Sequence, residues 1–194
     1  ILIGAQDADE RETGPVTGGV SAKMLLDVGC EYVLLGHSER RNLFRESDGV
    51  ISQKLKQAVK VGLKAIVCVG ETLEQRNSGQ VLEVISNQLK PIISQEILPQ
   101  SEELLIAYEP IWAIGSNKSA TIHQIGYALS EIRKILRDVD INLSDSTKIL
   151  YGGSVTEKNI AEILALDEVD GVLIGGASLD PKSFSKICRI AKTI

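Results

Sequence analysis

Two side chains of this sequence combine a reactive chemical type with the expected end of a strand. Glu109 directly follows the apolar run Leu104–Tyr108, and His37 follows Tyr32–Leu35 with only Gly36 between them. A carboxylate can remove a proton, and an imidazole can donate a hydrogen bond to a carbonyl oxygen. Taken alone, Glu109 could instead pair with an arginine, and His37 could be a capping or core histidine. The two positions together favour a catalytic pair.

The residues around His37 predict the charge state of its ring. Gly36 precedes it and the helix-forming run Ser38–Arg41 follows, so His37 is expected at a helix N-terminus. The positive end of a helix dipole disfavours an imidazolium. We therefore expect a neutral imidazole that can donate a hydrogen bond to a carbonyl. The other histidine, His123, is expected to open a helix in an exposed position and to have no function.

Two glycine clusters could hold an anion. Gly152-Gly153-Ser154 and Gly175-Gly176 follow two successive apolar runs. Glycine lets backbone N–H groups approach an oxyanion closely, and helix N-termini add a favourable dipole. One such pair is more often a simple turn, but two at successive strand ends predict a phosphate site. The run that starts at Gly115 lacks the spacing of a nucleotide-binding P-loop, and no strand is followed by the dinucleotide-binding glycine pattern.

Six apolar runs alternate with helical segments and are expected to position these groups. The expected strands are Ile1–Ile3, Tyr32–Leu35, Ala65–Val69, Leu104–Tyr108, Lys148–Tyr151 and Gly171–Ile174. The expected helices are Ser21–Val28, Asp48–Val61, Ser78–Ser94, Thr121–Arg137, Glu157–Ala165 and Pro181–Ala191. The strands are continuous apolar runs without alternation, which is typical of a parallel sheet buried on both faces. Six βα units predict an α/β fold, either an open doubly wound sheet or a closed barrel, and both place functional groups at the carboxyl ends of their strands.

Composition limits the classes of function. The net charge is -5, unlike the basic surface of a nucleic-acid binder. No apolar run approaches the roughly 20 residues that span a bilayer, so no membrane partner is expected. The three cysteines, Cys30, Cys68 and Cys188, form no CxxC pair, which argues against a zinc or redox motif and favours a reducing compartment. Cys68 is expected to be a buried structural residue.

Four segments resemble the triosephosphate isomerase family. They are Leu34–Arg41, Ala107–Gly115, Ile149–Val155 and Gly175–Leu179. The resemblance covers the whole chain and implies a (β/α)₈ barrel, the TIM barrel, which runs to about 250 residues. It places Ile1 at the third barrel strand. We therefore expect residues 1–194 to form a single barrel domain that lacks the first two βα units at its N-terminal side.

The resemblance implies an activity and a set of roles, which belong to the family. Dihydroxyacetone phosphate and D-glyceraldehyde 3-phosphate would interconvert by proton transfer through an enediolate. Glu109 would move the proton, neutral His37 would polarise the carbonyl, and a lid from Pro110 to Ala120 would close over the intermediate. The substrate phosphate would be held by Gly115, Ser154, Gly175 and Gly176. No cofactor or metal is expected, because the adjacent carbonyl already activates the proton.

The resemblance also implies a setting for the enzyme. We expect a cytoplasmic homodimer that acts in glycolysis and gluconeogenesis, with a link to the pentose phosphate pathway. The loop Asp7–Gly19 corresponds to the segment that the family uses for its dimer contact.

Two departures from the family pattern bear on activity. The lid carries Ser116, Asn117 and Ser119 where the family has Thr, Gly and Thr, and these replacements keep the hydroxyls and a residue that tolerates positive φ. The family's Asn and Lys on the first strand are not in this sequence, so we expect these residues alone to be inactive or unstable. One alternative is a truncated, non-catalytic barrel that binds phosphate. An aldolase or epimerase barrel is another, but no strand end here offers a Schiff-base lysine or metal ligands.

Overall fold

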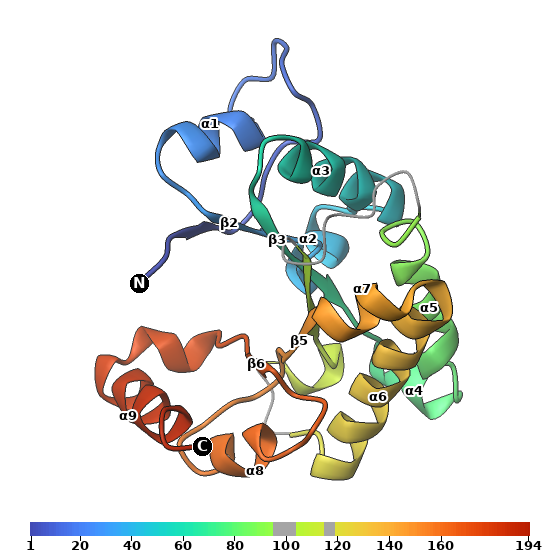
Figure 1. The fold of residues 1–194 in the computed structure, drawn as a ribbon, viewed down its shortest axis with the longest axis vertical. Coiled ribbons are helices and arrows are strands. Elements are labelled where there is room, and N and C mark those ends of the chain that lie inside the picture. Colours follow the sequence, from blue (N-terminus) through green and yellow to red (C-terminus); the bar gives the residue numbers. More distant parts are fainter. Residues whose placement is uncertain (95–103, 115–118) are drawn as a thin grey trace.

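Six parallel strands form one curved sheet with helices on its outer side (Figure 1). The computed structural model describes residues 1–94, 104–114 and 119–194. The strands are β1 (Gly4–Ala5), β2 (Tyr32–Leu35), β3 (Lys64–Val69), β4 (Leu104–Tyr108), β5 (Lys148–Tyr151) and β6 (Gly171–Val172). They lie in the order of the sequence, whereas a doubly wound sheet reverses its order. The sheet is therefore a half-barrel, and the ring of helices is open between the N-terminus and α9.

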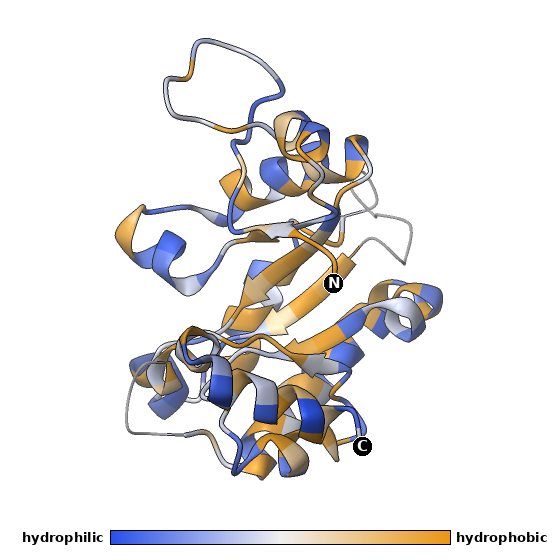
Figure 2. Ribbon diagram, turned by 90° about the vertical axis from the view of Figure 1, so that its left-hand side faces the viewer, coloured by the Kyte–Doolittle hydropathy of each residue, from blue (hydrophilic) through white to orange (hydrophobic). Residues whose placement is uncertain are grey.

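Helices connect the strands and cover the convex face of the sheet. They are α1 (Ala22–Asp27), α2 (Ser38–Leu43), α3 (Asp48–Lys60), α4 (Leu73–Asn77), α5 (Val81–Leu89), α6 (Ile122–Val139), α7 (Ile141–Ser146), α8 (Ile160–Leu164) and α9 (Pro181–Ala191). Two 3₁₀ turns, η1 (Ile111–Ala113) and η2 (Gly176–Leu179), follow β4 and β6. Figure 2 shows hydrophobic strands inside and hydrophilic residues on the outer helix surfaces. Within the described ranges, no helix has the length and apolar character needed to cross a membrane.

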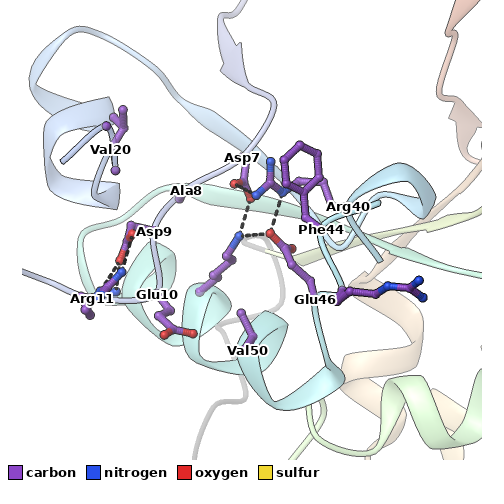
Figure 3. Close-up of a pocket in the computed structure, with 14 residues that line it drawn as sticks. Asp7, Ala8, Asp9, Glu10, Arg11, Val20, Arg40, Phe44, Glu46 and Val50 are labelled. Carbon is purple, nitrogen blue, oxygen red and sulfur yellow. Dashed lines mark hydrogen bonds and ion pairs between the residues drawn. The ribbon is translucent and has the colours of Figure 1, made fainter. Parts of the chain in front are cut away.

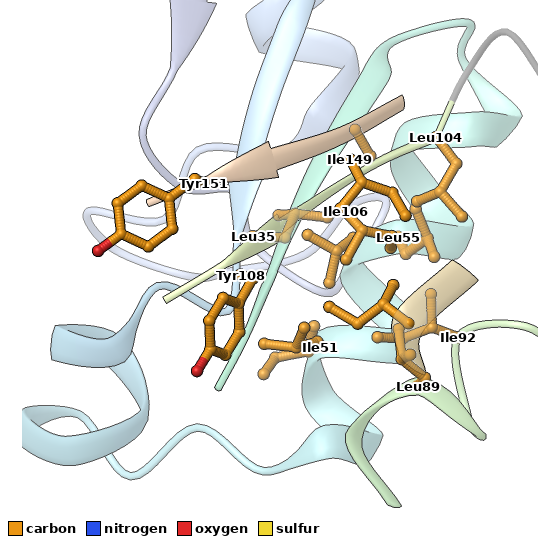
Figure 4. Packing of buried hydrophobic residues seen from close by; sticks show 14 of the residues in the cluster. Leu35, Ile51, Leu55, Leu89, Ile92, Leu104, Ile106, Tyr108, Ile149 and Tyr151 are labelled. Atoms are coloured by element: carbon orange, nitrogen blue, oxygen red, sulfur yellow. The ribbon is translucent and has the colours of Figure 1, made fainter. Parts of the chain in front are cut away.

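The core lies between the strands and the inner faces of the helices. Strand residues such as Leu35, Val67 and Ile106 are fully buried, and Ile51 and Leu55 of α3 pack with them (Figure 4). The buried face of α6 carries Ile125, Leu129, Ile132 and Leu136, as its sequence periodicity predicts. The sequence predicts strands buried on both faces, but burial alternates along β2 and β5, where every second residue is only partly buried or exposed. In these two strands only the face that packs against the helices is fully covered within the described residues.

Several element boundaries differ from the sequence-based expectations. The first strand is Gly4–Ala5 and not Ile1–Ile3, because Gly4 pairs with Tyr32 while Ile1 to Ile3 are exposed. The expected helix Ser78–Ser94 is shortened to α5, because Gly79, at φ +72°, turns the chain before it and Lys90 caps its end. A separate helix, α4, with its own capping box at Thr72, precedes that turn.

The end of the chain shows similar corrections. The expected helix Glu157–Ala165 contracts to α8, because residues before Ile160 form turns that are closed by hydrogen bonds between Thr156 and Asn159. The last strand ends at Val172 and not at Ile174. Helix α7 was not expected, and its start is explained by the Asp140 carboxylate, which accepts hydrogen bonds from the backbone N–H groups of Asn142 and Leu143.

Candidate active site

Glu109 and His37 are in direct contact. The Nε2 atom of His37 lies 3.0 Å from Oε1 of Glu109. The backbone N–H of Ser38 donates a hydrogen bond of 3.0 Å to the other carboxylate oxygen, Oε2. Glu109 is 3% exposed, so its charge is balanced within the protein and not by water. The two residues that the sequence singled out for proton chemistry therefore share one site.

The sheet topology explains this contact. Strands β2 and β4 both pair in parallel with β3, so their carboxyl ends lie at the same edge. The N–H of Glu109 continues that ladder by donating to the carbonyl of Val69, at 2.8 Å. His37 caps helix α2, where its Nδ1 accepts a hydrogen bond from the N–H of Glu39, at 3.3 Å. The predicted position of His37 at a helix N-terminus is thus confirmed.

Two influences oppose each other at the His37 ring. Contact with the Glu109 carboxylate raises the pKa of His37, and the more distant charge of Glu39 acts in the same direction, while burial lowers it. The contact with Glu109 outweighs burial, so the pKa of His37 is raised overall. A second ring proton on Nδ1 would have to displace the Glu39 N–H that this atom accepts. A neutral ring with its proton on Nε2 satisfies both contacts. The neutral charge state of the imidazole stays a prediction. Loss of the contact with Glu109 would favour it, because that contact raises the pKa of the ring.

A cavity of about 340 Å³ opens next to this pair. Its lining includes Ser154, Gly175 and Gly176, three of the expected phosphate-binding residues. A Cβ atom added at Gly175 or Gly176 would meet nothing within 4 Å, so the packing of the described chain does not itself require glycine there. Gly115, the fourth expected phosphate residue, lies outside the described residues, as does the middle of the expected lid.

The structure adds a functional candidate that sequence reasoning missed, and it shows an unusual buried hydroxyl next to Gly152–Ser154 in the sequence. Gln6 lines the same cavity from the end of β1. Its position directly after a strand was the available signal. Tyr151 has a buried hydroxyl without a hydrogen-bond partner among the described residues, and burial raises the pKa of Tyr151 to about 12. A Cβ at Gly153 would lie 2.1 Å from that hydroxyl, so this glycine is needed for the close approach of Tyr151.

Glu71, another polar residue at a strand end, does not face this cavity. It is fully buried, and its Oε1 accepts hydrogen bonds from Tyr108 at 3.1 Å, Arg76 at 2.8 Å and Trp112 at 2.9 Å. The guanidinium of Arg76 also lies over the Trp112 ring. Glu71 therefore anchors η1, the turn that directly follows Glu109 and Pro110.

A second cavity, of about 480 Å³, lies beside the loop Asp7–Gly19. The carboxylates of Asp7 and Glu46 converge there with the guanidinium of Arg40 (Figure 3). The ammonium of Lys54, 5% exposed, lies 2.7 Å from Asp7 and 2.6 Å from Glu46. Burial raises the pKa of Glu46, but hydrogen bonds from Lys54 and Arg40 outweigh it and lower that pKa overall. This is a buried ion network at the base of the loop.

The sequential parallel half-barrel, with Glu109 and His37 in contact at its carboxyl edge, defines the class of the protein as an α/β barrel. Comparison with known proteins identifies the family. The family described as Triosephosphate isomerase matches residues 1–191. The chain belongs to the triosephosphate isomerase family, and it is therefore an isomerase.

Curated relatives named triosephosphate isomerase align with nearly the whole chain. A triosephosphate isomerase of Natranaerobius thermophilus is 42% identical over 192 residues, which are 99% of this chain and 75% of that protein. One from Thermodesulfovibrio yellowstonii is 46% identical over 189 residues, with 97% and 76% covered. One from Moorella thermoacetica is 45% identical over 187 residues, with 96% and 75% covered. The chain thus spans about three quarters of the length of these relatives.

Proposed function

We propose that this protein interconverts dihydroxyacetone phosphate and D-glyceraldehyde 3-phosphate. The observation that carries the proposal is the Glu109–His37 contact of 3.0 Å, at the wall of a cavity that Gly175 and Gly176 also line. A cavity of this size accommodates a three-carbon phosphate ester. The glycine N–H groups bind the phosphate, and the reacting carbons then lie toward the carboxylate.

The chemistry needs one base and one hydrogen-bond donor. Glu109 takes the proton from the carbon next to the carbonyl, and the electron pair of that C–H bond forms the enediolate double bond. The oxygen that becomes negative is stabilised by the Nε2–H of His37. The proton of the adjacent hydroxyl group then moves to the former carbonyl oxygen, and Glu109 returns its proton to the former carbonyl carbon. The carbonyl group has thereby moved to the adjacent carbon, and the isomerisation is complete without a net oxidation. No cofactor or metal enters this sequence of steps.

The contacts in the structure show what substrate must displace. Glu109 is held by His37 and by the N–H of Ser38, so the substrate carbonyl has to replace the carboxylate at His37 Nε2. Once the carboxylate leaves the ring, the largest influence that raises the pKa of His37 is removed. A neutral ring is then favoured by the Glu39 N–H that Nδ1 accepts.

We further propose that two βα units precede Ile1 in the active protein and complete a single barrel domain. Two findings support this. The relatives are longer, and β1 and β6 each have one strand neighbour within the described ranges. The missing units would bring the family's Asn and Lys to the site. Because removal of an electrostatic group of this kind costs about 10²–10³-fold in rate, residues 1–194 should be far less active than the protein extended upstream, which we call the extended protein.

The experiment is to follow isomerisation and exchange of the substrate proton with deuterated solvent. We expect the extended protein to catalyse both, and Glu109→Gln to lose about 10²–10⁴-fold in rate because the base is gone. Exposed Asp167→Asn serves as the control and should retain full activity. Phosphate binding without turnover or exchange in the extended protein would instead establish the non-catalytic alternative.

We also propose a cytoplasmic homodimer that uses the loop Asp7–Gly19 and serves glycolysis, gluconeogenesis and the connected pentose phosphate pathway. The loop projects from the sheet in Figure 1, and the cavity at its base offers charges of both signs to a second copy. Sedimentation equilibrium of the extended protein tests the dimer. Deletion of residues 12–17 should give a monomer, and an unchanged dimer would contradict this assignment.

A further inference from the structure

Arg41 carries a buried guanidinium that does not line the substrate cavity. It lies on α2, and its side chain is 12% exposed. Its Nε donates to the carbonyl of Gly36 at 2.8 Å, and its Nη2 donates to the carbonyl of Cys68 at 3.0 Å. Its third contact is an ion pair with Asp48. One side chain thus joins backbone atoms that are 32 residues apart in sequence.

The two carbonyls stand where the sheet stops pairing. The ladder between β2 and β3 ends with the pair Leu35 and Val67, so the next pair in register would be Gly36 and Cys68. Gly36 has φ +69°, a left-handed conformation that turns the chain away from β3. Backbone pairing cannot continue there. The planar fork of Arg41 replaces the missing rung by binding both carbonyls at once.

Each of these carbonyls belongs to a residue that directly precedes a contact of Glu109. Gly36 is followed directly by His37 and Ser38, which both contact the Glu109 carboxylate. Cys68 is followed by Val69, whose carbonyl accepts the N–H of Glu109. The distance between His37 and Glu109 therefore depends on the distance between the carboxyl ends of β2 and β3. Arg41 fixes that distance, because it binds the Gly36 carbonyl after β2 and the Cys68 carbonyl on β3.

We propose that Arg41 is a positioning residue for the isomerisation: it fixes the carboxyl end of β2 against that of β3 and so holds His37 and Ser38 at their working distance from Glu109. This inference rests on the proposed function. A lysine keeps the charge for Asp48, but its single ammonium nitrogen lacks the planar fork whose two nitrogens hold the two carbonyls at a fixed spacing. A methionine keeps only the volume of the apolar stem.

The test compares Arg41→Lys and Arg41→Met with Arg137→Met as the control in the extended protein. Arg137 is exposed, and its nearest carboxylate is 4.0 Å away. We expect kcat to fall by up to about 100-fold in the Arg41 variants with KM changed less than threefold, because sub-ångström misplacement acts on the transition state. The control should keep both constants.

A second readout does not require turnover. The sequence has two histidines, so the ring resonances of His37 and His123 can be followed individually by NMR. Loosening the contact with Glu109 should lower the pKa of His37 in both Arg41 variants and leave that of His123 unchanged. An unchanged pKa of His37 together with unchanged kcat would overturn the proposal, as would unfolding of both variants, since Arg41 would then serve overall stability. A wild-type extended protein without activity would instead overturn the proposed function, and the NMR result would still decide whether Arg41 sets the His37–Glu109 contact.

Discussion

At the scale of single residues, the site depends on one carboxylate with three neighbours. Glu109 is nearly fully buried, and its negative charge is balanced by His37 on one oxygen and by the Ser38 N–H on the other. Cys68 lies next to this group, where burial and then the charge of Glu109 raise the pKa of the thiol. The thiol therefore stays protonated and acts as a small core residue, in agreement with the expected burial of Cys68.

The first prediction concerns the charge of His37. Replacement Glu109→Gln should lower the pKa of His37, because the carboxylate is the largest influence that raises it. The folded-state pKa is above the ordinary value of 6.5, so the contact stabilises the fold fully below pH 6.5 and loses this effect as the pH rises through the raised value. NMR titration gives the pKa, and denaturant unfolding at pH 5 and pH 9 gives the stability. Equal stability differences between wild type and Glu109→Gln at both pH values would contradict this.

The second prediction concerns the buried ammonium at the base of the loop. Lys54→Met should destabilise the protein by about 1.5–3 kcal/mol, because Asp7 and Glu46 would lose one of their two cationic partners and keep only Arg40. Lys60→Met is the matched control, since Lys60 pairs with Glu12 at an exposed site and should change stability by only about 0–1 kcal/mol. Urea unfolding of both variants provides the measurement. Equal midpoints would argue against a stabilising network.

At the scale of elements, polar side chains hold neighbouring strands together where few backbone hydrogen bonds join them. Strand β6 has two residues, and Asp170 just before it binds the N–H of Ile149 on β5 at 2.8 Å. Arg133 of α6 donates to Asp170 and also to the carbonyls of Ser144 and Thr147. Arg133 therefore joins α6 to the end of α7, and its ion pair with Asp170 joins both helices to the strand pair β5–β6.

The third prediction follows from this ion pair. Burial raises the pKa of Asp170, but the Ile149 N–H together with Lys148 and Arg133 outweighs it, so the pKa is lowered overall. The ionised Asp170 carboxylate therefore stabilises the fold fully when the pH is above 3.8, its ordinary pKa. This contribution disappears as the pH falls through the lowered pKa of the folded state. Asp170→Asn should cost about 1.5–3 kcal/mol at pH 7 and less at pH 2. Thermal unfolding at both pH values checks this, with Asp167→Asn as the control.

At the scale of the whole molecule, the half-barrel leaves apolar surface next to its open side. Ile1, Leu2 and Ile3 are more than half exposed. On the other side, Val172, Ile174 and Phe184 line a hollow between β6 and α9. Exposed apolar surface of this kind marks a site that another part of a protein covers. The proposed upstream units would be that part.

The fourth prediction tests this surface. Residues 1–194 should bind a hydrophobic dye such as ANS more strongly than the extended protein, and should unfold at lower urea concentration, because the upstream units bury the apolar residues. Fluorescence titration at equal chain concentration gives the comparison. Equal dye binding would indicate that the upstream segment does not cover the open side.

The sequence by itself determined six βα units, the polar groups at their strand ends and the pair Glu109 and His37. These follow from local rules: continuous apolar runs make buried parallel strands, and their carboxyl ends share one edge. Local patterns could not give the length of β1 or the start of α7, since pairing with Tyr32 and capping by Asp140 decide them. Only the tertiary structure decided that strands lie in sequential order, that Ser38 holds the second carboxylate oxygen, and that Arg41 bridges Gly36 and Cys68. Each of these depends on distances between segments that are far apart in the chain, and such distances are set when the whole core packs.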